Sequence, residues 1–304
     1  MMRLSDIFNG DVILKDGEFE TLGPTETRKS KTLVYCDTVH YVGKALNNDN
    51  ISCILTSEEL AEKALRSNKG IVCAQVPRNA FYQLHLEFVE QGLYDCEITP
   101  FRGENISIHP SAQVSKKSSI GDNVKIGQNV VIYDNVTIGN NSSIDAGAII
   151  GCDGLLYLHG PPPLHITHGG GVRIGRNVSI LANAVIVKSV HDTFLTSIGD
   201  HCIIGIHCNI GHEAHIENNS ILSSGCIVAR GARLSEGTFL GPGSILREYV
   251  NVGQKAGVKL GSVVIDNIPS HGVVSGSFAR DHLSNMRKYA VTRRKDNRKN
   301  DPNC

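Results

Sequence analysis

The chain has 304 residues, enough for two domains, and its 30 basic and 30 acidic residues give a formal net charge of zero. That balance argues against a nucleic-acid-binding protein, and no apolar run approaches the roughly 18 residues of a membrane span. The first twelve residues lack the apolar stretch of a signal peptide, and nine cysteines without a CxxC pair favour a reducing compartment, so we expect a cytoplasmic protein.

Residues 1–104 predict a small α/β domain. Helical segments alternate with short apolar runs: one follows a capping box of Thr56 and Glu59, and another begins at Pro77 and ends at Gly92. The apolar runs typical of buried strands are 31–36, 51–56 and 70–75. Tyr41 or its neighbour His40 is expected to stack on a flat base.

From Ile108 to Val264 the chain carries an aliphatic residue at nearly every sixth position. Of the 27 positions in this phase, 24 are Ile, Val or Leu, and glycine often follows. Neither the helix period of 3.6 nor the strand period of 2 has this spacing, so it indicates a hexapeptide solenoid rather than a sandwich of short strands. Three hexads make an 18-residue triangular coil, with room for roughly nine coils. The expected fold is therefore mainly β, with the solenoid at 105–276 and positive φ at the glycine and asparagine corners.

Two segments interrupt this pattern, 152–171 and 188–197, and the phase resumes after each. They are interpreted as loops thrown outward from a corner or as degenerate coils. After Pro269 the chain predicts a helix over 277–290, followed by a basic tail within 277–304 that either holds an acidic partner or is simply solvated.

Several segments resemble the UDP-3-O-(3-hydroxyacyl)glucosamine N-acyltransferases of lipid A synthesis. The segments are VPRNAFYQL (76–84), GCDGLLYLHG (151–160) with GGVRIG (170–175), CNIGHEAHIENN (208–219) and GSFARDHLSNMRK (276–288). The resemblance implies a left-handed coil, a uridine-binding N-terminal domain, a homotrimer with clefts between subunits, and a catalytic histidine at His212.

The chain also departs from that family. IVKSVHDT (186–193) replaces the family's Asp-x-Arg-Gly turn, and Tyr249 stands where a second functional histidine would fall. His212 and Glu213 resemble the His-acid pair of the N-acetyltransferases that modify bacillosamine and perosamine. We therefore expect an N-acyltransferase for a nucleotide-linked amino sugar in bacterial surface-glycan synthesis, with the lipid A enzyme as the first alternative.

The reaction needs a base, because a thioester is attacked by a neutral amine. His212 lies two residues after the inward Ile210, at an outward corner, with Glu213 and His215 near enough in sequence to orient it. The backbone of Arg230 and Gly231, one coil further on, is the expected oxyanion donor. Asn209 lies 18 residues after His191 and should share a corner with it; His191 either lines the same cleft or caps the loop after Lys188.

Two further classes stay open. A γ-carbonic-anhydrase-like metalloenzyme would use His207 and His212, but a third histidine two coils earlier is missing, so no metal is expected. A non-catalytic protein that binds a sugar nucleotide is the other. For the transferase we expect no tightly bound cofactor, and either acyl-CoA or acyl carrier protein as donor.

Overall fold

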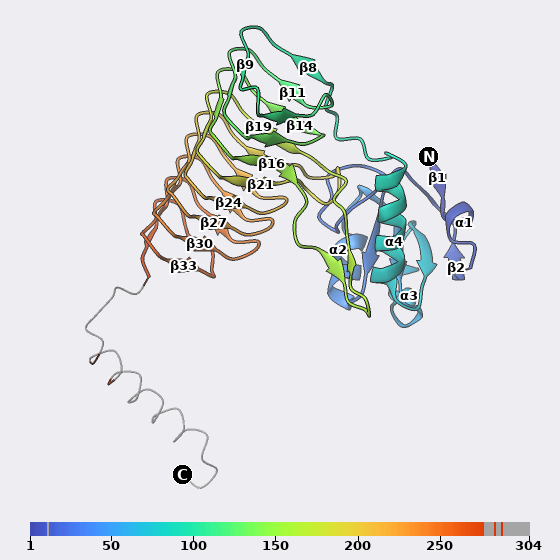
Figure 1. Ribbon diagram of the computed structural model, residues 1–304. Helices are drawn as coiled ribbons and strands as arrows, with labels where there is room; N and C mark the ends of the chain where they lie inside the picture. The colour runs from blue at the N-terminus through green and yellow to red at the C-terminus, as the bar shows by residue number, and fades with distance from the viewer. Residues whose placement is uncertain (11, 277–282, 284–286, 288–304) are drawn as a thin grey trace.

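The computed structural model describes residues 1–10, 12–276, 283 and 287, and contains an N-terminal domain beside a triangular prism of stacked coils (Figure 1). The predicted C-terminal helix over 277–290 and the basic tail lie outside the described residues, apart from positions 283 and 287. Among the described residues, no helix is long and apolar enough to cross a membrane.

The N-terminal domain is built on a five-stranded sheet in the order β2-β7-β6-β5-β4, in which only β2 runs antiparallel to its neighbour. Its strands are β2 (Val12–Lys15), β4 (Thr21–Leu22), β5 (Thr32–Cys36), β6 (Ile51–Thr56) and β7 (Gly70–Cys73). A short ribbon of β1 (Met2–Arg3) and β3 (Glu18–Phe19) and the single turn α1 (Leu4–Ile7) precede the parallel strands. The three strands expected from the apolar runs are confirmed.

Three further helices cover the two faces of this sheet. The helices α2 (Val39–Leu46) and α3 (Glu58–Ala64) pack over one face, around Val42, Ala45 and Ala64. The helix α4 (Pro77–Glu90) covers the other face through Phe81, Leu84 and Phe88, and it ends before Gly92, whose φ is +65°. The segment predicted from Pro77 to Gly92 is therefore confirmed as a helix.

The predicted capping box at Thr56 is wrong. Helix α3 begins at Glu58 with Ser57 as its N-cap residue, and no side chain caps it. Thr56 is instead the buried last residue of β6, where its hydroxyl donates to the Cys36 carbonyl 2.8 Å away. The Thr56 hydroxyl therefore bonds within the sheet and not to the first turn of the helix.

The prism has three parallel sheets, which we number first, second and third in chain order. The first contains β8 (Phe101–Arg102), β11 (Ser119–Ile120), β14 (Val136–Ile138), β19 (Val172–Ile174), β22 (Thr196–Ile198), β25 (His215–Ile216), β28 (Arg233–Leu234) and β31 (Asn251–Val252). The second contains β9 (Ser107–Ile108), β12 (Lys125–Ile126), β15 (Ser143–Ile144), β20 (Ser179–Ile180), β23 (Ile203–Ile204), β26 (Ile221–Leu222), β29 (Phe239–Leu240), β32 (Gly257–Val258) and β34 (Val273–Val274). The third contains β10 (Gln113–Val114), β13 (Val131–Ile132), β16 (Ile149–Cys152), β21 (Val185–Val187), β24 (Asn209–Ile210), β27 (Ile227–Val228), β30 (Ile245–Leu246) and β33 (Val263–Val264).

The aliphatic residue of each hexad points into the prism, where these residues form one continuous buried column. The expected cause of the corner glycines needs correction. Positive φ occurs three residues after the aliphatic position, at asparagines such as Asn123 and at glycines such as Gly225, whereas the glycine that directly follows the aliphatic residue does not adopt it, except at Gly151. That glycine is needed for close approach between coils, because a Cβ on Gly121 would lie 2.8 Å from the amide nitrogen of Asn140.

The two interrupting segments both leave the prism at the edge between the third and first sheets, which we call the N-domain edge. The first, between β16 and β19, carries the hairpin β17 (Tyr157–Leu158) and β18 (Leu164–His165); the second lies between β21 and β22. Ile138 pairs with Ile174, 36 positions on, and Ile174 pairs with Ile198, 24 positions on. The extra lengths are multiples of six, so the phase survives, but the sheets hold eight or nine strands and the prism has about eight coils, not nine.

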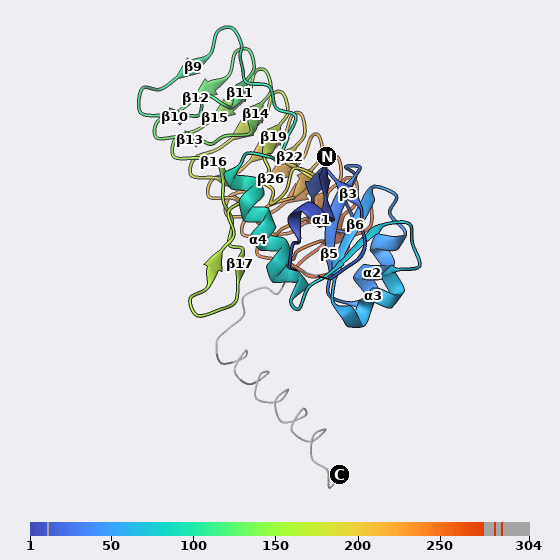
Figure 2. The ribbon, with the colours of Figure 1, turned by 90° about the vertical axis from the view of Figure 1, so that its right-hand side faces the viewer.

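The same two segments attach the N-terminal domain to the prism. Leu158, Ile166 and Val190 enter the apolar cluster of α4, and the hairpin runs beside that helix in both views (Figures 1 and 2). The buried Asp192 carboxylate pairs with Lys29 Nζ at 2.5 Å and accepts hydrogen bonds from the Thr21 hydroxyl and the Asp95 amide. Apolar packing and a satisfied buried ion pair thus place this domain over the N-domain edge.

Candidate active site

A cavity of about 540 Å³ lies between the N-terminal domain and the N-domain edge. It opens near the carboxyl ends of β4 and β5, where ligands commonly bind in parallel sheets. Its lining residues from the N-terminal domain are Gly23, Pro24, Thr25, Glu26, Tyr35, Tyr41, Lys44, Phe81 and Tyr82. Those from the prism and its insertions are Leu156, Val190, His191, Phe194, His212, Glu213, Arg230, Gly231, Arg233, Tyr249 and Asn251.

His212 and Glu213 lie together in this cavity. Both occupy the corner after β24, and the side chains are only 12% and 17% exposed because the N-terminal domain and the first insertion cover them. Glu213 Oε2 is 3.8 Å from His212 Nδ1, and the Glu213 amide donates to Thr196 Oγ1 at 2.8 Å. His212 Nδ1 is buried and has no hydrogen-bond partner among the described residues. Nε2 is therefore the nitrogen that a substrate can reach from the cavity.

Of the two backbone amides predicted to bind the oxyanion, Arg230 and Gly231, only that of Arg230 is free to do so. The Gly231 amide donates to the His212 carbonyl at 2.9 Å, so the prediction for Gly231 is wrong. Within the described chain, the Arg230 amide has no hydrogen-bond partner.

The corresponding backbone amide is paired at another edge of the prism. At the edge between the first and second sheets, Asp122 and Asp200 donate their amides to Asn140 and Asn218 of the next coil. At the N-domain edge the position one coil after Arg230 is Glu248, and no hydrogen bond joins its side chain to the Arg230 amide.

His191 lies at the closed end of the cavity. It is 5% exposed and packs edge-on or stacked against Phe81, Tyr82, His85 and Tyr94, so it lines the cleft and does not cap the loop. Burial holds its pKa well below the ordinary value, and neither ring nitrogen has a hydrogen-bond partner among the described residues. The imidazole is therefore neutral, and both of its nitrogens are buried and unpaired within the described chain.

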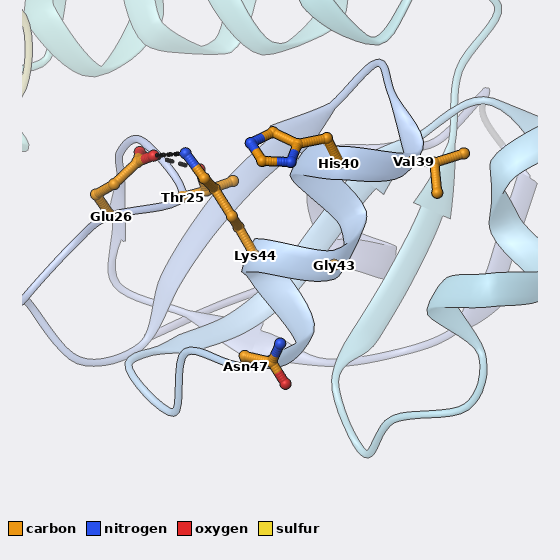
Figure 3. A pocket seen from close by; sticks show the side chains of 7 residues that line it. All are labelled: Thr25, Glu26, Val39, His40, Gly43, Lys44 and Asn47. Carbon is orange, nitrogen blue, oxygen red and sulfur yellow. Dashed lines mark hydrogen bonds and ion pairs between the residues drawn. The ribbon is translucent and has the colours of Figure 1, made fainter. Parts of the chain in front are cut away.

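The two aromatic residues predicted to stack on a nucleotide base, Tyr41 and His40, line different hollows in the structure. Tyr41 lines the cavity, with Lys44 Nζ 5.5 Å from its ring centroid. His40 faces a second hollow along α2, lined by Thr25, Glu26, Val39, His40, Gly43, Lys44 and Asn47 (Figure 3). The Lys44–Glu26 ion pair of 2.7 Å borders both spaces. The prediction for His40 therefore does not hold for the cavity that contains His212.

Two other predicted residues lie elsewhere. Asn209 is exposed on the third sheet and pairs with Val185, because the second insertion makes this coil 24 residues long; the corner shared with His191 was wrong. His215 points outward from β25, beside Ser197 and Glu217 in a separate hollow, and it does not orient His212.

Tyr249 does line the cavity, and the Arg230 guanidinium lies 5.2 Å from its ring centroid. A second cationic side chain, Arg233, lies one residue beyond the same corner. The open end of the cavity is therefore cationic and aromatic, which suits a phosphorylated ligand.

The sequence does not mark His168 as a site residue, although it lies in the hexad phase within the first interrupting segment. It comes from the first insertion, is 1% exposed, and its ring centroid is 5.3 Å from that of His212. The sequence does not mark the buried His85 either. No motif marks either residue as part of the site, because both reach it through tertiary packing.

No group of three or more His, Cys, Asp or Glu among the described residues is arranged to hold a metal ion. His207 and His212, the two ligands expected for a metalloenzyme, do not lie in one site. His212 lines the cavity, whereas His207 is an exposed corner residue with φ +56°.

Comparisons with known proteins agree with the fold. Residues 117–152 match the family model described as bacterial transferase hexapeptide (six repeats). No curated protein sequence matches the chain. It is similar in structure to UDP-N-acetylglucosamine acyltransferase from Campylobacter jejuni, with 27% identity, a TM-score of 0.53, and coverage of 60% of this chain and 76% of that one.

Two other solved structures overlap more weakly. The acyltransferase of the same name from Francisella novicida has 23% identity, a TM-score of 0.41, and coverage of 62% and 73%. Perosamine N-acetyltransferase from Caulobacter crescentus, solved with CoA and GDP-perosamine, has 18% identity, a TM-score of 0.22, and coverage of 74% and 67%. Neither overlap is close enough to carry an argument about this chain.

The hexapeptide segment and the likeness to the C. jejuni enzyme define the class: the chain is an acyltransferase built on a left-handed parallel β-helix. The narrower resemblance to UDP-3-O-(3-hydroxyacyl)glucosamine N-acyltransferases is not supported by these comparisons and stays an expectation.

Proposed function

We propose that this protein transfers an acyl group from a thioester, acyl-CoA or acyl carrier protein, to the amine of a nucleotide-linked amino sugar. The observation that carries the proposal is the cavity, which joins Tyr41 and Lys44 of the N-terminal domain to His212 and Glu213 of the prism. One ligand with a base, phosphates and a sugar would span these groups. The choice between the two donors, acyl-CoA and acyl carrier protein, and a role in bacterial surface-glycan synthesis are part of this proposal.

In the proposed reaction the sugar amine has first lost one proton to solvent, and His212 Nε2 removes a second proton from the nitrogen as the neutral amine attacks. The amine nitrogen bonds to the thioester carbon, and the carbonyl oxygen becomes an oxyanion that accepts the Arg230 N–H. The intermediate then expels the thiolate, which takes the proton back from His212. Glu213, 3.8 Å from Nδ1, offsets the positive charge that the imidazole carries in between.

The nucleotide end of the ligand is assigned to the open part of the cavity. Tyr41 offers an aromatic face for the base, and Arg230 and Arg233 offer guanidinium groups for the phosphates. Tyr249, beneath the Arg230 guanidinium, would hold that side chain in place. His191 and Phe194 close the end that faces the sugar and acyl group.

The Tyr41→Ala variant should raise KM for the sugar nucleotide by about 10-fold, because one base–aromatic stack contributes roughly 1–3 kcal/mol. The KM for the acyl donor should stay within a few-fold. Tyr133→Ala is the matched control, since Tyr133 is 45% exposed on the prism and does not line the cavity. An equal rise in both KM values would remove the reason for placing the nucleotide at Tyr41.

The function itself is tested by a substrate panel. UDP- and dTDP-linked amino sugars are combined with short-chain and long-chain acyl-CoA and with acylated carrier protein, and thiol release is measured. Amide formation with an amino sugar supports the proposal. Turnover of UDP-N-acetylglucosamine alone would show acylation of a hydroxyl and contradict it. No thiol release with any pair would favour a binding protein without catalysis.

The lipid A N-acyltransferase is the second candidate, because the C. jejuni enzyme that the chain is similar to is a UDP-N-acetylglucosamine acyltransferase. Its acceptor would be a UDP-3-O-acylglucosamine and its donor a long acyl chain on carrier protein. A preference for that pair over all other members of the panel would select it.

We also propose a homotrimer, supported by two adjoining apolar faces of the prism. Outward side chains of the second and third sheets that are 37–63% exposed are Ile203, Ile221, Phe239, Val273, Ile227, Ile245 and Val263. The outward residues of the first sheet are mostly polar: Ser119, Thr137, Arg173, Ser197, His215, Arg233 and Asn251. Exposed apolar rows on two faces suit packing against two copies of the same chain.

The variant Phe239→Glu should convert the trimer to monomers, because it places a charge in the middle of the apolar rows. Thr137→Glu on the polar first sheet is the control and should remain trimeric. Light scattering after size exclusion measures the assembly, and circular dichroism checks that the β-helix persists. A monomeric wild-type protein, or a trimeric Phe239→Glu, would contradict the proposed interface.

A further inference from the structure

His168 is a buried histidine beside the candidate base for which the mechanism above has no role. Its ring stands nearly perpendicular to that of His212, at 81°, with the ring centroids 5.3 Å apart. No hydrogen bond joins the two rings in this structure, but the hydrogen bonds of catalytic groups are often long or poorly aligned until substrate is bound. Among the described residues, His168 Nε2 and His212 Nδ1 are both buried without a hydrogen-bond partner.

The surroundings of His168 determine which of its nitrogens carries hydrogen. Its Nδ1 lies 2.9 Å from the Lys188 carbonyl, and a carbonyl only accepts, so Nδ1 must be the protonated nitrogen. Burial lowers the pKa of His168, which keeps the ring neutral. Nε2 therefore presents a lone pair.

Both insertions hold this ring in place. The His168 amide donates to Asp153 Oδ1 at 3.2 Å, and Asp153 pairs with Lys188 Nζ at 3.1 Å. The Lys188 amide in turn donates to the Cys152 carbonyl. A Cβ at Gly154 would lie 3.1 Å from His168 Cε1 and 3.6 Å from His212 Cδ2, so the glycine lets the chain pass close to both rings.

We propose that His168 is the positioning residue of the base: when substrate occupies the cavity, its Nε2 accepts the Nδ1–H of His212. This contact selects the tautomer of His212 whose Nε2 lone pair faces the cavity. Glu213, at 3.8 Å, is too far for a hydrogen bond to the same nitrogen and acts through its charge. His168 gains and loses no proton, because Nδ1–H stays on His212 throughout. The inference rests on the proposed role of His212 as general base.

The test compares His168→Leu with His168→Gln. Leu fills the space without an acceptor, whereas the Gln amide oxygen can take the place of Nε2. We expect kcat to fall on the order of 10–100-fold in His168→Leu, with both KM values near wild type, and His168→Gln to recover most of it. His159→Leu, an exposed residue of the same insertion, is the control and should match wild type.

A double variant separates positioning from a merely structural effect. If His168 acts through His212, adding His168→Leu to His212→Ala should cause no further loss of kcat. Ring ¹⁵N chemical shifts, measured with the sugar nucleotide bound, should show His212 as the Nδ1–H tautomer in the wild type and a shift toward Nε2–H in His168→Leu.

The outcomes distinguish this inference from the proposed function. Wild-type kcat in His168→Leu, together with an inactive His212→Ala, would overturn the inference alone. Failure of Gln to rescue activity, or an unchanged tautomer in His168→Leu, would overturn it too. An active His212→Ala would remove the general base itself and with it the premise.

Discussion

Replacing His212 by alanine should lower kcat by about 10²–10⁴-fold, the usual contribution of a positioned general base. The side chain stands outside the aliphatic column, so the variant should fold and assemble normally. Binding of the sugar nucleotide, measured by calorimetry, should change much less than kcat. The reason is that, in the proposed binding mode, the nucleotide contacts Tyr41 and the two arginines and not the imidazole.

Two corner histidines serve as controls for this variant. His201 and His207 are exposed on other edges of the prism and have φ of +60° and +56°, a conformation that asparagine tolerates. His201→Asn and His207→Asn should stay within a few-fold of wild type. Near-normal turnover in His212→Ala would end the proposed mechanism, whereas a variant that fails to assemble would show that the residue is structural.

The fold could be predicted because the repeat of the prism is visible in the sequence as a period of six residues. An inward aliphatic residue every six positions is required by the geometry of each short strand, so Ile108 to Val264 could be assigned without tertiary information. The number of coils could not, because both insertions have lengths that are multiples of six and leave no break in phase.

The same arithmetic explains which site residues were found. Beyond the second insertion each coil has 18 residues, so Arg230, expected one coil after His212, lies on the same edge; Tyr249, selected from the resemblance, also lines the cavity. Asn209 was paired with His191 across the insertion, where the step is 24, and the prediction failed. The position of His168 could not be predicted for another reason. Its contact with His212 depends on the path of the hairpin that packs on α4.

Acidification should destabilise this protein between about pH 6.5 and pH 4, through its buried neutral histidines. His85 is fully buried; its Nε2 donates to the Thr167 carbonyl at 2.8 Å, so its Nδ1 accepts from the Tyr94 hydroxyl. Burial lowers the pKa of His85 to about 4 and also lowers the pKa values of His191 and His168. These side chains ordinarily titrate near 6.5 in an unfolded chain.

The sign follows from proton binding. Below pH 6.5 the unfolded chain binds protons at these histidines while the folded protein does not, so the free energy of unfolding falls with pH until the folded pKa is reached. His85 alone should account for a loss of about 3 kcal/mol over this range. The stabilisation is fully present above pH 6.5.

The variant His85→Gln isolates this contribution, because the amide can serve both Thr167 and Tyr94 without titrating. It should be less stable than wild type at pH 7.5, and the gap should close by about 2–3 kcal/mol at pH 4.5, as measured by urea unfolding at each pH. His159→Gln, at an exposed histidine, should keep the wild-type slope. If His85→Gln loses stability as steeply as wild type, the carboxylates and not the buried imidazoles control acid unfolding, and the neutral state assigned to this cluster is wrong.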